Sequence, residues 1–278
     1  MRDSYRRQLE ILHTELIRMG ALCEDAIDCA AKGLLNEDVS LRDKAHHVEA
    51  EIDIKEREIE AVCGKLLLRE QPVAGDLRQI TTAQKIITDM ERIGDMAADI
   101  ADISAFMEGS PVKSDVHIGD MARAAIKMLS DSVDSFVAGD LEKAKTVIRY
   151  DDVVDGLFSK VKSELIAHII AGGVPHDTGA AAGASTFVGA AISASESTSA
   201  DASTAAASAS ASASTAAAGA PTAAASTAAA AVGALSPERH ATACLDLLMI
   251  AKYLERIGDH AENIAESVVY SITGMREH

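Results

Sequence analysis

Tryptophan is absent from this chain of 278 residues, aromatic residues make up only 3% of it, and it holds just 5 prolines. This composition argues against an all-β sandwich, because strands favour aromatic residues and their turns favour proline. The prolines fall at expected helix boundaries or in a linker, at Pro72, Pro111, Pro175, Pro221 and Pro237. We therefore expect an all-α fold of long helices that no proline interrupts.

Basic residues are also scarce, with 26 lysines and arginines against 43 acidic residues and a formal net charge of −17. A nucleic-acid-binding protein needs a basic face to displace counterions from phosphates, so that class of partner is excluded. The acidic balance leaves metal cations and basic protein surfaces as partners.

The sequence shows no long apolar run and no C-x-x-C pair. No stretch of about 18 strongly apolar residues is present to span a membrane. The first residues lead into an amphipathic helix rather than a signal peptide, which indicates a cytoplasmic protein. We expect buried, free thiols in a reducing compartment at the four cysteines, Cys23, Cys29, Cys63 and Cys244.

Helical periodicity is present along most of the chain. One apolar stripe steps by three and four residues from Leu9 to Leu34, and Asp38 is the expected N-cap of the helix that follows. A second helix is expected to run to about Glu70, and a third to begin at 71–72 and end at 109–111. Long helices with short connections predict an antiparallel bundle.

The pattern then recurs. A fourth helix is expected over about 116–137, and Glu91-Arg-Ile-Gly-Asp95 reappears unchanged as Glu255-Arg-Ile-Gly-Asp259, at an offset of 164. The preceding helices match at an offset of 102, so about 62 residues are inserted in the second copy. We expect two tandem three-helix repeats, residues 1–110 and 111–275. An Ala/Ser-rich segment over 173–236 interrupts the second, and its composition predicts disorder.

Carboxylates four residues apart share a helix face, and the chain places such pairs at equivalent positions in both repeats. The expected metal ligands are Glu49, Asp53, Glu91 and Asp95 in the first repeat and Asp151, Asp155, Glu255 and Asp259 in the second. Like charges at this spacing cost roughly 0.2–0.5 kcal/mol per pair, and a cation held between two helices would offset that cost. His260 is a further candidate ligand or support.

Two alternatives would account for the same acidic pairs. Arg92 and Arg256 could supply counter-charge, leaving an ordinary solvated face that binds nothing. A carboxylate-bridged cluster could equally serve a metal-dependent enzyme in redox or hydrolytic chemistry. Against an enzyme, the chain shows no phosphate-binding loop, nucleophile elbow or dinucleotide fingerprint. Gly94 and Gly258, which recur inside the expected helices, indicate close helix approach or room for an ion.

The duplicated bundle resembles the PhoU family of phosphate-uptake regulators. The resemblance is carried by three segments: residues 69–78 (REQPVAGDLR), residues 89–95 (DMERIGD), and residues 245–266, which contain the second ERIGD motif. It covers about residues 1–171 and 237–275.

The resemblance implies two three-helix bundles with multinuclear iron or zinc held by the eight carboxylates named above; magnesium or manganese would also suit them. Asp99 would be an extra ligand where Asn263 stands in the second repeat. It further implies a non-enzymatic negative regulator of the phosphate-starvation response, often a homodimer. Such a regulator would link the ATPase subunit of a phosphate ABC transporter to a phosphate-sensing histidine kinase, reaching the membrane through these partners.

Overall fold

The computed structural model describes residues 2–70, 72–114, 116–172 and 236–275. Six α-helices account for most of them, with no strand among these residues: α1 (Arg2–Asn36), α2 (Val39–Glu70), α3 (Ala74–Ser104), α4 (Ile118–Ala138), α5 (Leu141–Gly172) and α6 (Pro237–Thr273). Two short 3₁₀ helices, Ala105–Met107 and Pro111–Ser114, connect α3 to α4. The predicted all-α fold and its six helices are confirmed.

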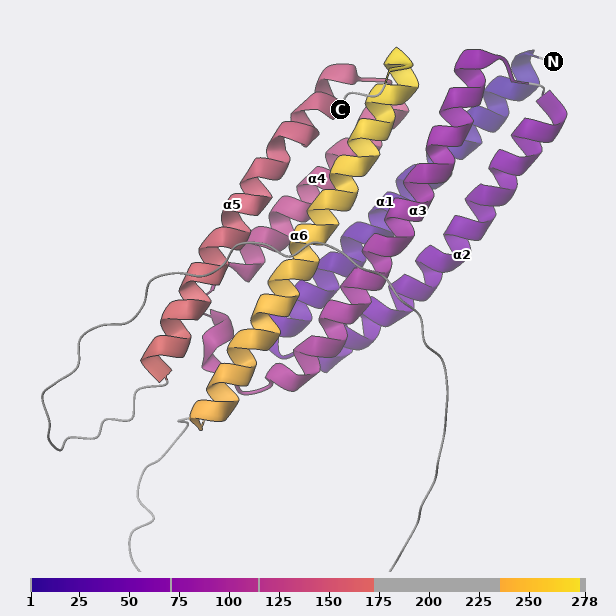
Figure 1. Ribbon diagram of the computed structural model, residues 1–278. Helices are drawn as coiled ribbons and strands as arrows, with labels where there is room; N and C mark the ends of the chain where they lie inside the picture. The colour runs from indigo at the N-terminus through magenta and orange to yellow at the C-terminus, as the bar shows by residue number, and fades with distance from the viewer. Residues whose placement is uncertain (1, 71, 115, 173–235, 276–278) are drawn as a thin grey trace, which may run out of the picture. The chain divides into compact units, whose positions relative to one another are not determined.

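The helices form two layers within one compact unit (Figure 1). In the first layer α2, α3, α6 and α5 lie side by side, and in the second α1 packs against α4. α1 also contacts α2 and α3, while α4 contacts α5 and α6. The two sets of three helices therefore meet along α3 and α6 in the first layer and along α1 and α4 in the second. Whether 1–110 and 111–275 act as separate domains stays a prediction.

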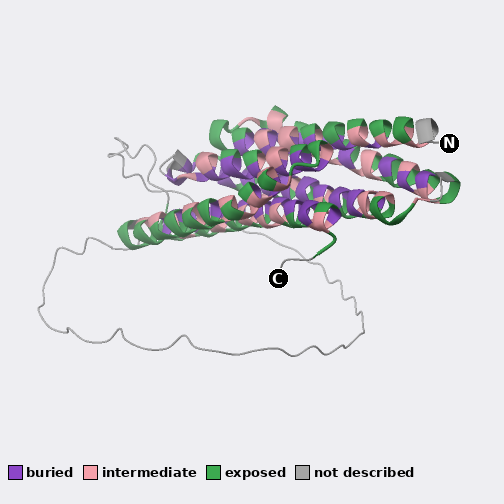
Figure 2. Cartoon of the chain, turned by 90° about the horizontal axis from the view of Figure 1, so that it is seen from above, coloured by how far each residue is buried: buried purple, intermediate pink, exposed green. Residues whose placement is uncertain are grey.

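The core is aliphatic and continuous through both sets. The predicted stripe of α1 is buried from Leu12 to Leu34, and Ile80, Ile93, Leu247 and Ile257 are fully covered as well. Figure 2 shows the buried positions on the facing sides of the helices and the exposed ones outside. All four cysteines are free and buried, as predicted.

The turns between paired helices are built alike. Glu37 and Gly139 both adopt positive φ, 55° and 65°, after the last turn of α1 and α4. The next residue, Asp38 or Asp140, donates its N–H to the carbonyl of Gly33 or Ser135. Its side chain then accepts an N–H of the following helix, which confirms Asp38 as an N-cap.

The long insertion predicted over 173–236 lies outside the described residues except for Ser236. The Ser236 side chain accepts the N–H of Arg239 and caps α6, with Pro237 in the first turn. None of the described helices combines the length and the apolar character that crossing a membrane requires.

Candidate metal centre

Two equivalent glycines bring the acidic helices together. A Cβ on Gly94 of α3 would lie 3.0 Å from Ile52 Cδ1 of α2, and a Cβ on Gly258 of α6 would lie 3.2 Å from Val154 Cγ1 of α5. Ile52 and Val154 are themselves equivalent at the 102-residue offset. The expected close approach of helices is confirmed at both positions, and it brings the neighbouring carboxylates of the two helices near one another.

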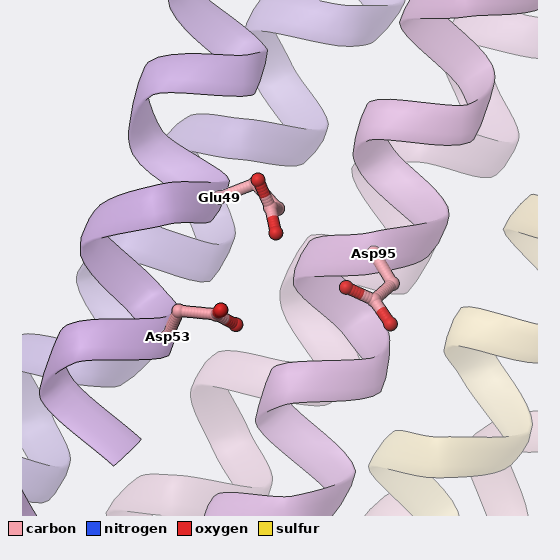
Figure 3. A group of neighbouring side chains, drawn as sticks. All are labelled: Glu49, Asp53 and Asp95. Carbon is pink, nitrogen blue, oxygen red and sulfur yellow. The ribbon is translucent and has the colours of Figure 1, made fainter. Parts of the chain in front are cut away.

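Three of the four carboxylates predicted in the first repeat converge. Oxygen atoms of Glu49 and Asp53 from α2 and of Asp95 from α3 all lie within 4.8 Å of one another. Figure 3 shows these side chains facing each other across the space between the two helices. Glu91, one turn before Asp95, is outside this group of three.

The converging carboxylates repel one another. The pKa of Glu49 is raised by burial and by the charges of Asp53 and Asp95. The pKa of Asp95 is raised by burial and by Asp53 and Asp99. Within the described part of the chain, only Asp53 among the three has an ion pair, with Arg57 at 3.1 Å. A set of hard oxygen donors with so little counter-charge fits a divalent cation.

The second repeat holds a related but looser set between α5 and α6. Its four carboxylates do not bring three oxygens within the same 4.8 Å, yet they interact electrostatically. The pKa of Asp151 is raised to about 6 by burial and by the negative charges of Asp155, Asp259 and Glu255. Glu255 is paired with Lys252, one turn away on α6. Whether this second set binds metal stays a prediction.

Sequence reasoning missed Glu262 in this second set. Burial and the charges of Asp151 and Glu266 raise the pKa of Glu262 to about 7. Its equivalent in the first repeat is Ala98, so comparing the repeats gave no signal. The available clues were the three-residue step from Asp259 and the four-residue step to Glu266.

His260 faces the other repeat rather than the acidic set on α5. Its Nδ1 donates to Asp89 Oδ1 of α3 at 2.9 Å, with the two side chains 12% and 15% exposed. The pair ties α6 to α3 beside the second set.

The repeated helices and the paired glycines are consistent with the result of a comparison to known families. The sequence model of the PhoU domain matches residues 16–104, 118–193 and 225–268. The chain belongs to the PhoU family.

Individual relatives agree with this family. The "Phosphate-specific transport system accessory protein PhoU homolog" of Aquifex aeolicus is 36% identical over 165 residues, 59% of this chain and 75% of that protein. The protein of the same name from Clostridium acetobutylicum is 29% identical over 278 residues, 99% of this chain and 97% of that protein. The crystal structure of PhoU from Pseudomonas aeruginosa superposes with a TM-score of 0.68 at 24% identity, covering 98% of this chain and all of that one. That last likeness confirms the fold.

Proposed function

We propose that this chain is an accessory regulator of phosphate-specific transport that keeps the phosphate-starvation response off when phosphate is plentiful. One observation carries the proposal: 99% of the chain aligns with the phosphate-specific transport system accessory protein of Clostridium acetobutylicum. The regulator would act in the cytoplasm, as a homodimer, by contacting the transporter ATPase and a phosphate-sensing histidine kinase. It has no catalytic role in this proposal.

Deleting the gene tests the regulatory role. Expression of phosphate-starvation genes in phosphate-rich medium should rise in the deletion strain and return to the basal level when the full chain is supplied. Unchanged expression would contradict the role. Pull-downs with the ATPase and the kinase, run with and without phosphate, test the two partners separately.

We also propose that the two acidic sets bind metal. Glu49, Asp53 and Asp95 would hold a cation between α2 and α3, with Glu91 as a further ligand. The second set, Asp151, Asp155, Glu255 and Asp259, would do the same between α5 and α6. Iron or zinc is the metal that the family implies. Bound metal would neutralise the crowded carboxylates and hold α2 against α3 and α5 against α6.

Metal content measured after purification without chelator tests the ligands. Asp95→Asn should lower the bound metal per chain, since it removes the only ligand of the converging set on α3. Glu51→Gln, an exposed carboxylate on the outer side of α2, should leave the metal content unchanged. Equal loss in both variants would contradict the assignment. Turnover of phosphate esters or peroxide that disappears in Glu91→Ala and Glu255→Ala would favour an enzyme instead.

A further inference from the structure

A groove lined by both polar and apolar side chains runs along the seam between α3 and α6, apart from the converging carboxylates. Its volume is about 870 Å³, within the usual range for small-molecule sites. α3 and α6 contribute most of its lining, and Ile148 of α5 closes part of it. The lining residues that matter below are Lys85, Asp89, Arg92, Asn263, Glu266 and Ser267.

Two cations face this groove from the same side. Lys85 and Arg92 are seven residues apart on α3, which puts them on one face at a rise of roughly 10 Å. Among the described residues neither forms an ion pair, although Asp89 and Glu266 line the same groove. Both side chains are exposed, and an anionic ligand in the groove would give each of them a partner.

The acidic residue between them is already engaged. Asp89 lies one turn from Lys85, but its Oδ1 accepts from His260 Nδ1 at 2.9 Å. Across the groove, α6 presents the Asn263 amide and the Ser267 hydroxyl, both able to donate hydrogen bonds. Besides the acidic Asp89 and Glu266, the lining therefore offers two cations and two neutral donors, the groups that bind the oxygens of an oxyanion.

We propose that the α3–α6 groove binds a phosphate group, with Lys85 and Arg92 contacting its oxygens and Asn263 and Ser267 donating from the opposite wall. The choice of phosphate among oxyanions rests on the function proposed above. The volume admits inorganic phosphate or a small phosphorylated metabolite.

Glu266 opposes this ligand. It lines the groove from α6 and is exposed, so its charge repels an anion bound between Lys85 and Arg92. The charges in the groove therefore predict opposite effects on phosphate affinity: loss of either cation weakens binding, and loss of the Glu266 charge strengthens it. A bulk charge effect would not single out these positions.

Titration of the full chain at constant ionic strength tests the site, with inorganic phosphate, a nucleoside monophosphate and sulfate as separate probes. Calorimetry should detect binding of at least one phosphate probe. Lys85→Gln and Arg92→Gln should each weaken it about tenfold, and Glu266→Gln should tighten it. Lys65→Gln, an exposed lysine on α2 without an ion-pair partner among the described residues, should change nothing.

The outcomes separate the sources of the ligand. Binding of inorganic phosphate, or of the nucleotide alone, supports the site and names its source. Equal binding of sulfate overturns the choice of phosphate. Wild-type affinity in Lys85→Gln/Arg92→Gln overturns the site, because phosphate would then bind elsewhere on the chain. Absence of binding would also overturn it, while the gene-expression test of the regulatory role would stand on its own.

Discussion

Glu262 is a carboxylate whose ionisation works against the fold. Its pKa of about 7 lies well above the ordinary value of an unfolded glutamate, so the native state binds a proton that the unfolded state has released. The contribution of Glu262 to stability is therefore fully present below the unfolded pKa and is lost as the pH rises through 7.

Glu262→Gln should raise the free energy of unfolding at pH 8 and change it little at pH 5. The gain follows from removing a negative charge that Asp151 and Glu266 repel. Urea unfolding of chelator-treated protein at both pH values measures it, with Glu51→Gln as the matched exposed carboxylate. A gain of the same size at both pH values would show that charge is not the cause.

Gly94 has a packing role that another helical glycine lacks. Gly94→Ala should lower the free energy of unfolding by about 1 kcal/mol, since its Cβ would press on the buried Ile52 side chain. Gly64 of α2 has no atom within 4 Å of an added Cβ, so Gly64→Ala should raise that free energy by about 1 kcal/mol. Thermal unfolding of the two variants compares them, and a gain in both would mean that α2 can shift away.

At the scale of helices, the turn after α4 depends on its glycine. Gly139 has φ 65° and nothing within 4 Å of an added Cβ, so backbone strain is the only cost of a side chain there. Gly139→Ala should lower the free energy of unfolding by about 1–2 kcal/mol. Chemical denaturation measures the loss; an unchanged midpoint would mean that the turn adopts another conformation.

The equivalent Glu37 tolerates the same conformation through its side chain. Its carboxylate accepts the N–H of Gly109 at 2.9 Å and pairs with Lys113, which is largely buried. Glu37 thereby fastens the turn after α1 to the connection between α3 and α4. A repeated turn has become a link between the repeats in one copy only.

The caps after the paired-helix turns and the packing glycines were predictable because they depend on local sequence and on a period of 3.6 residues. Asp38 and Gly94 are examples: the first is a cap and the second recurs in a motif. The third helix differs at both ends: it begins at Ala74, slightly later than expected, and ends at Ser104, before the expected 109–111. Val73 at its N-terminal cap position makes no side-chain capping bond. Without such a bond the start was poorly marked.

Contacts between helices far apart in sequence were not predictable from the pattern. The Asp89–His260 pair and the groove beside it depend on how α3 and α6 align along their shared seam. Of the eight predicted ligands, the structure brings Glu49, Asp53 and Asp95 closest together. The sequence could not single out these three, because the spacing of residues on one helix does not fix their distance to the next helix.

At the scale of the whole chain, the ends of α5 and α6 already lie together. His240 Nε2 contacts the carbonyl of His168 at 3.0 Å, close to both ends of the long insertion. Replacing residues 173–235 with a short Gly/Ser linker should therefore leave the helix content and the melting temperature nearly unchanged. Circular dichroism checks both, and a fall in melting temperature of many degrees would show that the segment stabilises the helices.

Burial of its four cysteine thiols makes the native chain slow to react with thiol reagents. Burial raises the pKa of Cys63 to about 11 and that of Cys23 still further, so neither presents a thiolate at neutral pH. Cys23 Sγ also donates to the carbonyl of Met90 at 3.3 Å. A maleimide or disulfide reagent can reach these atoms only when helices separate. The rate of thiol labelling therefore measures how often the bundle opens.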